Sequence, residues 1–343
     1  MANASAPLRL IALGGSENAA ACIGRALGVV PVPSHETWFA CGEGKVVIGD
    51  NVRGCRVFLV ASLVLPGGER SIYDRLMMTL NGVEALALSD AAEVTVVMPY
   101  FPGARQDKRK GRTREGITAG LVARMLEVAG ADRVLTVEIH NEAIAGMFNP
   151  RKCTLENIYL HNHFGPWLRE QGLCGDTVVS PDVGGLERAR RYAETLGLAI
   201  ATLSKERDYT HPNRVVRSTL LGTVQGRDVL MVDDIVDTAG SVRSAVSELK
   251  AQGARNITVA CVLPLLSGPA WARLRILREQ AEDEGWRFTV VGTSAVKHSE
   301  APSWYRSYSL EPLLAQVIRS IHSRGSVTRV QDGSQVPDEM DGE

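Results

Sequence analysis

The chain has 343 residues, of which 45% are hydrophobic and 22% charged, and its formal net charge is −1. This length and composition are typical of a soluble globular protein with room for two domains, each with its own core. A net charge so close to zero provides no overall field that would attract nucleic acid or an acidic membrane, so we expect neither as a partner.

The six cysteines are scattered along the chain, with no CxxC pair and no zinc-binding spacing. This usage is typical of a reducing compartment, and we therefore predict a cytoplasmic protein. The longest apolar runs, at Val57–Pro66 and Val259–Leu266, are too short to cross a bilayer. The N-terminus lacks the basic start and long apolar segment of a signal peptide.

Strands and helices alternate in the first half of the chain, which indicates a mostly parallel sheet. The expected strands are Leu8–Leu13, Val46–Ile48, Arg56–Ala61, Glu93–Met98 and Arg133–Ile139. The expected helices are Glu17–Leu27, Ile72–Ser89 and Ile117–Ala129, the last of which ends at Gly130.

The alternation starts again in the second half. The expected strands are Thr177–Ser180, Leu198–Ala201, Val215–Leu221, Val229–Val232, Ile257–Val262 and Arg287–Val291. The expected helices are Gly185–Leu196, Val242–Lys250, Ala270–Glu282 and Glu311–His322. Two successive α/β units of similar length suggest a duplicated domain. We predict domains at residues 1–155 and 156–324, followed by a polar, disordered tail at residues 325–343.

The segment Pro99–Thr118, PYFPGARQDKRKGRTREGIT, lies between an expected strand and an expected helix. Six cations stand within ten residues of it: Arg105, Lys108, Arg109, Lys110, Arg112 and Arg114. Such a run is most often a solvated loop. Contact with nucleic acid is a second interpretation, but no aromatic stacking pattern accompanies the cations. The third is a clamp for a polyphosphate, because guanidinium groups match phosphate oxygens.

Two more polar groups stand at the ends of expected strands. His140 follows a strand in VEIHN, and Asp182 follows another in SPDVGG. A lone histidine is more often a buried hydrogen-bonding residue, but the carboxyl edge of a parallel sheet favours a ligand. A carboxylate such as Asp182 can hold Mg²⁺, while the turn amides of the glycines can meet a phosphate.

Lys205 and Arg207 begin a polar segment that runs to Arg214, and this segment is typical of a mobile loop. Two cations at the base of a mobile loop can close over a charged reaction. A simple solvated loop is the alternative interpretation.

The stretch Val229–Ser241, VLMVDDIVDTAGS, combines a short buried strand, three acids and small residues that lead into a helix. Free N–H groups at a helix start can hold a phosphate. Carboxylates suit sugar hydroxyls, or a metal ion that also touches phosphate. The loop therefore indicates a sugar phosphate as ligand. A plain helix cap is a weaker explanation, because a cap needs only one acid.

This loop resembles the ribose 5-phosphate loop of the phosphoribosyltransferase superfamily. An ordered series of further motifs makes the resemblance more specific. The series runs ENAAACIGRALGV, NVRGCRVFLV, PYFPGARQD, EVAGADRVLTVEIHN, SPDVGGLERAR, SKER, VDDIVDTAGS and LSGPA. From about Ile11 to His322 the chain resembles the ribose-phosphate pyrophosphokinases, also called phosphoribosyl-pyrophosphate synthetases.

The resemblance implies an α/β protein with two similar phosphoribosyltransferase-type domains, each a mostly parallel sheet flanked by helices. It also implies transfer of the diphosphoryl group of ATP to the 1-hydroxyl of ribose 5-phosphate, with Mg²⁺ as cofactor and a dimer-based homo-oligomer, up to a hexamer, as the assembly. The implied catalytic cations are Lys205 and Arg207, and the implied magnesium ligands are His140 and Asp182. The implied ATP-binding residues are Phe39, Cys41, Glu43, Arg105 and Gln106. The implied ribose 5-phosphate residues are Arg207, Asp233, Asp234, Asp237, Thr238, Ala239, Gly240 and Ser241.

The chain departs from the family pattern at Cys41, where the family usually has aspartate. A neutral thiol is a poor substitute for a carboxylate that accepts from the adenine amino group. Two alternatives to the active synthetase remain open, and Cys41 argues for the first of them only. One is a catalytically weak regulatory subunit, and the other is a phosphoribosyltransferase that consumes the same ligand. The motifs PYFPGARQD and SKER argue against the transferase.

Overall fold

In a computed structural model, the structure describes residues 6–207 and 215–333, apart from the side chains of residues 205–207 and 215–218. The chain divides into two units. The first unit contains the chain up to Tyr159 together with the segment from Ser309 onward, and the second contains Leu160–Tyr308. No helix in the described part of the chain is both long enough and apolar enough to span a membrane.

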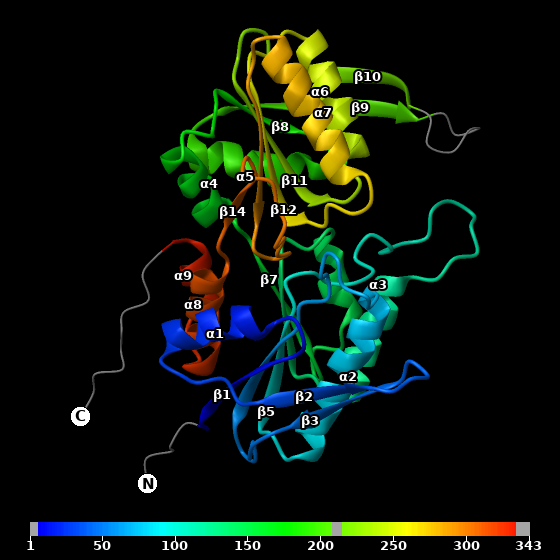
Figure 1. Cartoon of the computed structure of the whole chain (residues 1–343), viewed down its shortest axis with the longest axis vertical. Coiled ribbons are helices and arrows are strands. Elements are labelled where there is room, and N and C mark those ends of the chain that lie inside the picture. The colour runs from blue at the N-terminus through cyan, green and yellow to red at the C-terminus, as the bar shows by residue number, and fades with distance from the viewer. Residues whose placement is uncertain (1–5, 208–214, 334–343) are drawn as a thin grey trace. The chain divides into compact units, whose positions relative to one another are not determined.

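The first unit is built on a five-stranded parallel sheet in the order β1-β4-β5-β6-β7. Its strands are β1 (Leu8–Ala12), β4 (Arg56–Val60), β5 (Glu93–Val97), β6 (Arg133–Val137) and β7 (Thr154–Ile158). Helices α1 (Glu17–Leu27) and α8 (Glu311–His322) cover one face, and α2 (Ile72–Leu88) and α3 (Thr118–Ala129) cover the other (Figure 1). Four consecutive residues are buried in each of β4, β5 and β6, as expected for strands covered on both faces.

Three smaller elements complete the first unit. A two-stranded antiparallel hairpin, β2 (Ser34–Trp38) and β3 (Gly44–Ile48), packs on α2, where Asn81 Nδ2 donates to the Gly44 carbonyl (3.1 Å). A 3₁₀ helix (Glu142–Met147) follows β6, and the short helix α9 (Val327–Gln331) follows α8.

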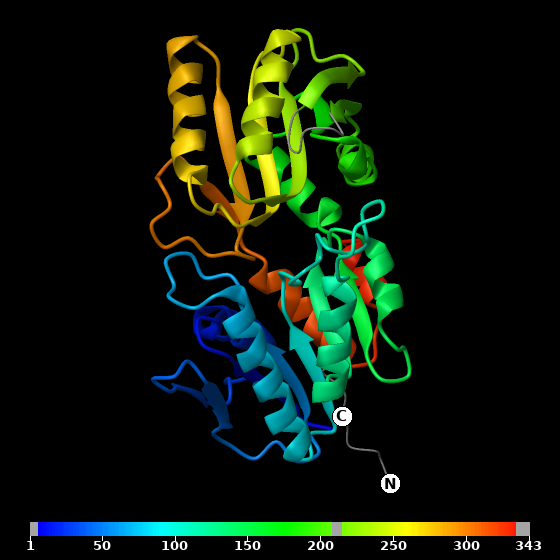
Figure 2. The ribbon, with the colours of Figure 1, turned by 90° about the vertical axis from the view of Figure 1, so that its right-hand side faces the viewer.

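The second unit is built on a seven-stranded sheet in the order β10-β9-β8-β11-β12-β13-β14. Its strands are β8 (Thr177–Ser180), β9 (Ala199–Arg207), β10 (Val215–Leu221), β11 (Val229–Val236), β12 (Ile257–Pro264), β13 (Phe288–Thr293) and β14 (Arg306–Tyr308). All pairs are parallel except β9 with β10. Helices α6 (Gly240–Ala251) and α7 (Ala270–Asp283) lie on one face, and α4 (His161–Glu170) and α5 (Leu186–Leu196) lie on the other (Figure 2).

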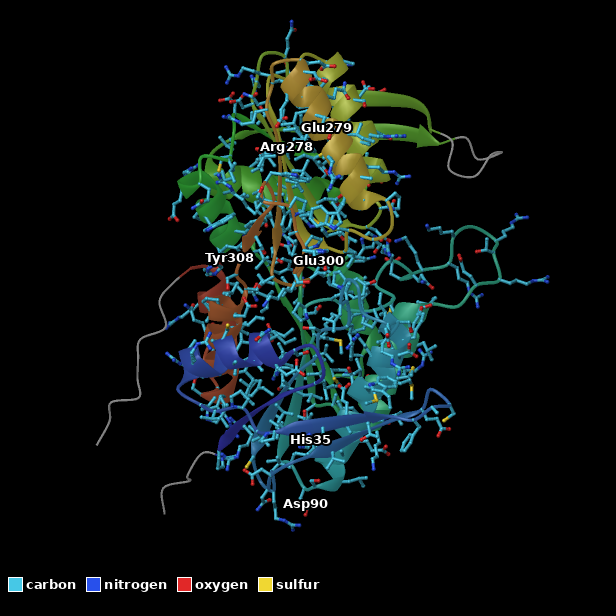
Figure 3. All side chains as sticks on the ribbon, in the orientation of Figure 1. His35, Asp90, Arg278, Glu279, Glu300 and Tyr308 are labelled. Atoms are coloured by element: carbon cyan, nitrogen blue, oxygen red, sulfur yellow. The ribbon has the colours of Figure 1, made fainter. Side chains whose placement is uncertain are left out.

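Aromatic side chains anchor the edge strand β14 to the second unit. The ring of Tyr308, labelled in Figure 3, lies 5.4 Å from that of Phe164 and 5.5 Å from that of Trp167, both on α4. Phe164 is fully buried, so these contacts belong to the core. Offset and edge-to-face ring pairs of this kind stabilise a core beyond the area they bury.

The predicted fold class, two α/β units with mostly parallel sheets, is confirmed. The extents of two strands differ from the prediction. β9 continues to Arg207 because it pairs with β10, so Lys205 and Arg207 lie in a strand and not in the predicted mobile loop. The rest of that predicted loop, residues 208–214, lies outside the described residues. β11 continues to Val236 because its pairing with β12 extends past the acids.

The C-terminal segment also differs from the prediction. Residues 309–324 belong to the first unit and not to the second, because α8 packs on α1 and Arg319 Nη2 donates to the Ala26 carbonyl (2.8 Å). Part of the predicted disordered tail is a helix, since α9 begins after Ser326 and buries Val330 completely. The last ten residues of the predicted tail, 334–343, lie outside the described residues.

Candidate active site

The strand order of the second unit reverses between β8 and β11. From β8 the chain continues to β9 on one side, and β11 lies against β8 on the other side, with Met231 opposite Val179. Ligands of open α/β sheets bind beyond the carboxyl ends of the strands at such a switch point. Asp182 follows β8, and Asp233, Asp234 and Asp237 stand at the end of β11. The topology therefore brings together acids that are about 50 residues apart in the sequence.

A nearly buried ion pair supports the acids of β11. Arg188 Nη1, from the first turn of α5, lies 3.3 Å from Asp234 Oδ1, and only 13% and 7% of the two side chains are exposed. The Asp234 N–H donates to Asp233 Oδ1 (3.0 Å). Burial, together with the negative charge of Asp234, raises the pKa of Asp233 well above its ordinary value, and Asp182 adds to the shift. The site is thus rich in negative charge, with Arg188 as a partly compensating cation.

The Asp182 turn is shaped by short polar contacts. Asp182 Oδ1 accepts from the Gly185 N–H (3.0 Å), and its backbone carbonyl accepts from the hydroxyls of Ser180 (2.6 Å) and Thr202 (3.2 Å). A Cβ on Gly185 would meet the Ser180 hydroxyl at 2.8 Å, so this position requires glycine. These contacts hold the exposed Asp182 carboxylate just beyond the carboxyl end of β8, at the switch point.

The loop after β11 is held by the segment Leu265–Ala270, which contains the LSGPA motif. The Ser267 N–H donates to the Asp237 carbonyl (2.9 Å), and the Leu266 N–H donates to the Val236 carbonyl (3.0 Å). Arg273 Nη1 donates to the Thr238 carbonyl (2.9 Å). These three bonds fix the backbone of the loop from its outer side.

The next residue, Ala239, has a backbone conformation that alanine rarely adopts. Its φ is +57° and its side chain is buried. Such left-handed geometry costs roughly 1–3 kcal/mol and is concentrated at functional sites. Ala239 ends the loop and is the N-cap residue of α6, a helix that no described side chain caps. Its first N–H groups, near the exposed Thr238 and Ser241, are therefore suited to bind a phosphate.

In the first unit, the structure brings Arg105 and Gln106 close to His140. The first two follow β5 and His140 follows β6, and these strands are neighbours. Asn141 Nδ2 donates to Asp107 Oδ2, and this bond joins the two loops directly. Burial opposes ionisation of Asp107, but hydrogen bonds from Lys108 and Asn141 outweigh it and lower the pKa of Asp107. Arg105, Gln106 and His140 are all exposed, as binding residues must be.

The three other predicted ATP-binding residues form a separate group at the tip of the β2–β3 hairpin. The Phe39 N–H donates to the Glu43 carbonyl (2.8 Å), and the Gly42 N–H donates to the Phe39 carbonyl (2.9 Å), which closes a tight turn. Gly42 has φ +94°, a value that favours glycine. Phe39, Cys41 and Glu43 are all exposed in this turn.

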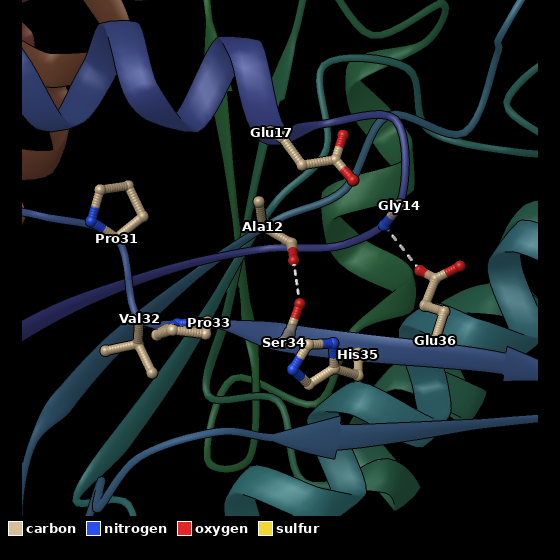
Figure 4. Close-up of a pocket in the computed structure, with 9 residues that line it drawn as sticks. All are labelled: Ala12, Gly14, Glu17, Pro31, Val32, Pro33, Ser34, His35 and Glu36. Carbon is tan, nitrogen blue, oxygen red and sulfur yellow. Dashed lines mark hydrogen bonds between the residues drawn. The ribbon is translucent and has the colours of Figure 1, made fainter.

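The first unit also contains a pocket of about 400 Å³ beside the end of β1 (Figure 4). Two hydrogen bonds join residues of its lining, since Ser34 Oγ donates to the Ala12 carbonyl (2.5 Å) and the Gly14 N–H donates to Glu36 Oε1 (2.7 Å). None of the predicted site residues lines this pocket. We therefore assign it no part in the site.

The donor set of the second unit fits a magnesium ion that also contacts phosphates. Among the side chains that the structure describes, no three His, Cys, Asp or Glu residues form a complete metal-binding cluster. Mg²⁺ does not require one, because it usually retains waters and binds through one or two carboxylates plus substrate phosphates. The exposed carboxylate of Asp182, at the switch point near the acids of β11, supplies a ligand of this type.

Sequence reasoning missed two residues that support the site, Arg188 and Cys261. Arg188 stands inside the recognised SPDVGGLERAR motif, one turn into an expected helix, and a cation there could have been suspected as a partner for the acids. Cys261 gave no signal in the sequence. In the structure its Sγ accepts from the Val236 N–H (3.1 Å) and its thiol donates to the Asp234 carbonyl (3.7 Å), so it ties the end of β11 to β12.

Comparison with protein families gives two matches. Residues 8–130 match the N-terminal domain of ribose phosphate pyrophosphokinase. Residues 166–277 match the phosphoribosyl transferase domain. The two matches fall in the first and second structural units respectively.

Individual relatives match over nearly the whole chain. A ribose-phosphate pyrophosphokinase of Halalkalibacterium halodurans is 35% identical over 333 residues, which are 97% of this chain and 100% of the relative. Ribose-phosphate pyrophosphokinase 1 of Streptococcus agalactiae is 39% identical over 319 residues, 92% of this chain and 94% of the relative. The crystal structure of phosphoribosylpyrophosphate synthetase from Mycobacterium smegmatis superposes with a TM-score of 0.80 at 30% identity, covering 93% of this chain and 100% of that one. The chain therefore belongs to the ribose-phosphate pyrophosphokinase family.

Proposed function

We propose that this protein transfers the intact β,γ-diphosphoryl group of ATP to the 1-hydroxyl of ribose 5-phosphate, forming 5-phosphoribosyl 1-pyrophosphate and AMP for nucleotide biosynthesis. Family membership over nearly the full length supports this reaction. The observation that carries it is the loop in which three carboxylates precede an uncapped helix N-terminus at the switch point of a sheet. This combination suits a ligand with both hydroxyls and a phosphate.

In this proposal the second unit binds ribose 5-phosphate. Asp233, Asp234 and Asp237 accept hydrogen bonds from the ribose hydroxyls. The backbone N–H groups between Thr238 and Ser241, including those of Ala239 and Gly240, bind the 5-phosphate. The ion pair with Arg188 holds the Asp234 carboxylate in place for this task.

The proposed catalytic cations are Lys205 and Arg207, at the end of β9. Phosphoryl transfer depends on positioning and charge neutralisation more than on covalent catalysis. The two cations would stabilise the charge that develops on the diphosphoryl group and on the departing AMP. Arg207 would also contact ribose 5-phosphate.

The first unit supplies the proposed ATP-binding residues. Arg105 and Gln106 contact the nucleotide from the loop after β5, and Phe39, Cys41 and Glu43 contact it from the hairpin. We further propose that His140 and Asp182 take part in binding Mg²⁺. When bound, the ion neutralises phosphate charge and orients the phosphoryl groups.

One assay tests the reaction against its alternatives. The protein is incubated with ATP, ribose 5-phosphate and Mg²⁺, and AMP and the pyrophosphorylated sugar are quantified. We expect the two products in equal amounts. Ligand binding without turnover would indicate a catalytically weak regulatory subunit. Consumption of added phosphoribosyl pyrophosphate with a nucleobase, and no AMP from ATP, would indicate a transferase.

Replacing Asp237 with asparagine should raise KM for ribose 5-phosphate about tenfold or more, because a charge-assisted hydrogen bond contributes roughly 1.5–3 kcal/mol. KM for ATP should remain close to that of the parent. Asp228→Asn is the matched control, because Asp228 lies at the opposite end of β11 and pairs with Arg255 (2.6 Å). A selective loss of ATP affinity in Asp237→Asn would contradict the assignment of the loop.

Replacing Cys41 with aspartate should raise the ratio of kcat/KM for ATP to that for GTP by about tenfold or more, since the charged bond to the adenine amino group contributes roughly 1.5–3 kcal/mol. The same carboxylate repels the carbonyl oxygen that guanine presents at that position. Cys41→Asn is the uncharged control, since an amide can pair with either group. An unchanged ratio in Cys41→Asp would show that the nucleotide is selected elsewhere.

We also propose a cytoplasmic homo-oligomer built from dimers. All six cysteines are free thiols, in keeping with a reducing compartment. Tyr73 and Met77, one turn apart on α2, are 56% and 51% exposed, and Leu121 on α3 is 49% exposed, so these packed helices present apolar side chains to a second copy. Sedimentation analysis of the parent and of Met77→Glu would test this assembly.

A further inference from the structure

The backbone immediately before His140 is held in an unfavourable conformation. Glu138 has φ +43°, although it is not glycine, and only 4% of the residue is exposed. A left-handed non-glycine residue costs roughly 1–3 kcal/mol and persists only where its surroundings enforce it. The question is which groups enforce this turn.

Two hydrogen bonds from β7 hold the turn. The regular pairing of β6 with β7 ends at Val137, opposite Ile158. Beyond that point the Glu138 N–H donates to the Ile158 carbonyl (2.9 Å), and the Ile139 N–H donates to Asn157 Oδ1 (2.9 Å). The side chain of Asn157 therefore provides an acceptor for the residue next to His140, where the strand ladder has already ended.

The strand that carries Asn157 is itself braced from the C-terminal end of the chain. β7 is one of the two edge strands of its sheet. Gln331, in α9, accepts from the Tyr159 N–H through Oε1 (3.2 Å) and donates to the Asn157 carbonyl through Nε2 (3.3 Å). Its amide thus pairs with the edge strand as the peptide group of a neighbouring strand would. Full burial of the adjacent Val330 keeps α9 in place.

We propose that Asn157 is a positioning residue that sets the His140 turn for catalysis, and that Gln331 braces it by holding the outer edge of β7. The proposal rests on the proposed role of His140 in binding Mg²⁺ with ATP. Asn157 and Gln331 touch no reacting atom in this scheme. They act through the backbone, which carries their effect to His140.

Asn157→Leu is the main test, because leucine is close to asparagine in size but cannot accept a hydrogen bond. We expect kcat/KM for ATP to fall about tenfold or more, since small displacements of a catalytic group have effects of this size or larger. KM for ribose 5-phosphate should be close to that of the parent. Asn157→Asp retains the acceptor but brings a charge to the buried position of Nδ2, which has no hydrogen-bond partner among the described residues, so its kcat/KM for ATP should lie between those of Asn157→Leu and the parent.

The double variant His140→Ala with Asn157→Leu separates this inference from the proposed function. If Asn157 acts through His140, the double variant should be no slower with ATP than His140→Ala alone, because the two effects are not independent. Normal ATP kinetics in His140→Ala would refute the role of His140 itself. A slow His140→Ala beside a normal Asn157→Leu, or losses that multiply in the double variant, would refute positioning by Asn157.

Gln331→Met tests the brace, because methionine has a similar length and no hydrogen-bonding amide. We expect a loss of kcat/KM for ATP in the same direction as for Asn157→Leu but smaller, with ribose 5-phosphate kinetics preserved. Gln280→Met is the matched control, since the Gln280 side-chain amide donates to Glu284 at the end of α7 in the second unit (2.9 Å). ATP kinetics equal to those of the parent in Gln331→Met would refute the bracing role.

Discussion

Replacing Lys205 with alanine is expected to lower kcat by about 10²–10³-fold, the usual effect of removing one group that stabilises transition-state charge. KM for both substrates should change little, because the charge that Lys205 stabilises develops only during transfer. Lys205 stands near the end of β9, at the start of the polar segment that the sequence predicts to be a catalytic loop. Steady-state kinetics with each substrate varied in turn provide the measurement.

Two control variants sharpen this test. Lys205→Arg keeps the positive charge and should retain more activity than the alanine variant. Arg190→Ala removes a cation from the same unit, but Arg190 forms exposed ion pairs with Glu187 and Glu194 on α5 and should leave kcat unchanged. A kcat in Lys205→Ala equal to that of the parent would remove Lys205 from the mechanism.

Replacing Arg188 with methionine should reduce the free energy of unfolding by about 3 kcal/mol, because removing one partner of a buried ion pair takes away much of the attraction that offsets the desolvation of the other. Both groups are nearly buried, and the Asp234 carboxylate would lose the cation that lies 3.3 Å away. We also expect a higher KM for ribose 5-phosphate, since the acids of β11 would lose their support. Denaturant unfolding at neutral pH measures the first effect.

A double-mutant cycle isolates the pair. In Arg188→Met with Asp234→Asn the buried charge is absent, so much of the stability lost in the single variant should return. Additive losses in the double variant would mean that Arg188 stabilises the second unit through other contacts. In either case Lys108→Met, which removes an exposed cation from the other unit, should leave the unfolding of the second unit unchanged.

Local patterns in the sequence were sufficient to predict most of the helices and strands. α1, α8, β8 and β10 have the predicted boundaries, because each has a clear apolar pattern between turn residues. The sequence did not predict β2, β7, β14 or α4. β7 alternates weakly and is only partly buried at an edge, and α4 contains Pro166, so neither resembles a typical element.

The family and the fold class follow from the sequence by itself. The ordered motifs that support the resemblance are local, and the sugar-phosphate loop combines strand, acids and helix start within 13 residues. A phosphate site of this type needs only the backbone of one turn, so a short stretch is enough to encode it.

Only the tertiary structure decided which distant residues act together. Asp182 meets the acids of β11 because strand order reverses at β8, and strand order is a property of the whole sheet. Arg188 reaches Asp234 across 46 residues, Asn157 supports Ile139 from the neighbouring strand, and Gln331 reaches β7 from 174 residues away. α8 joins the first unit for the same reason. Each of these pairings depends on how buried faces and hydrogen-bonding edges find partners in the folded chain, which no local pattern encodes.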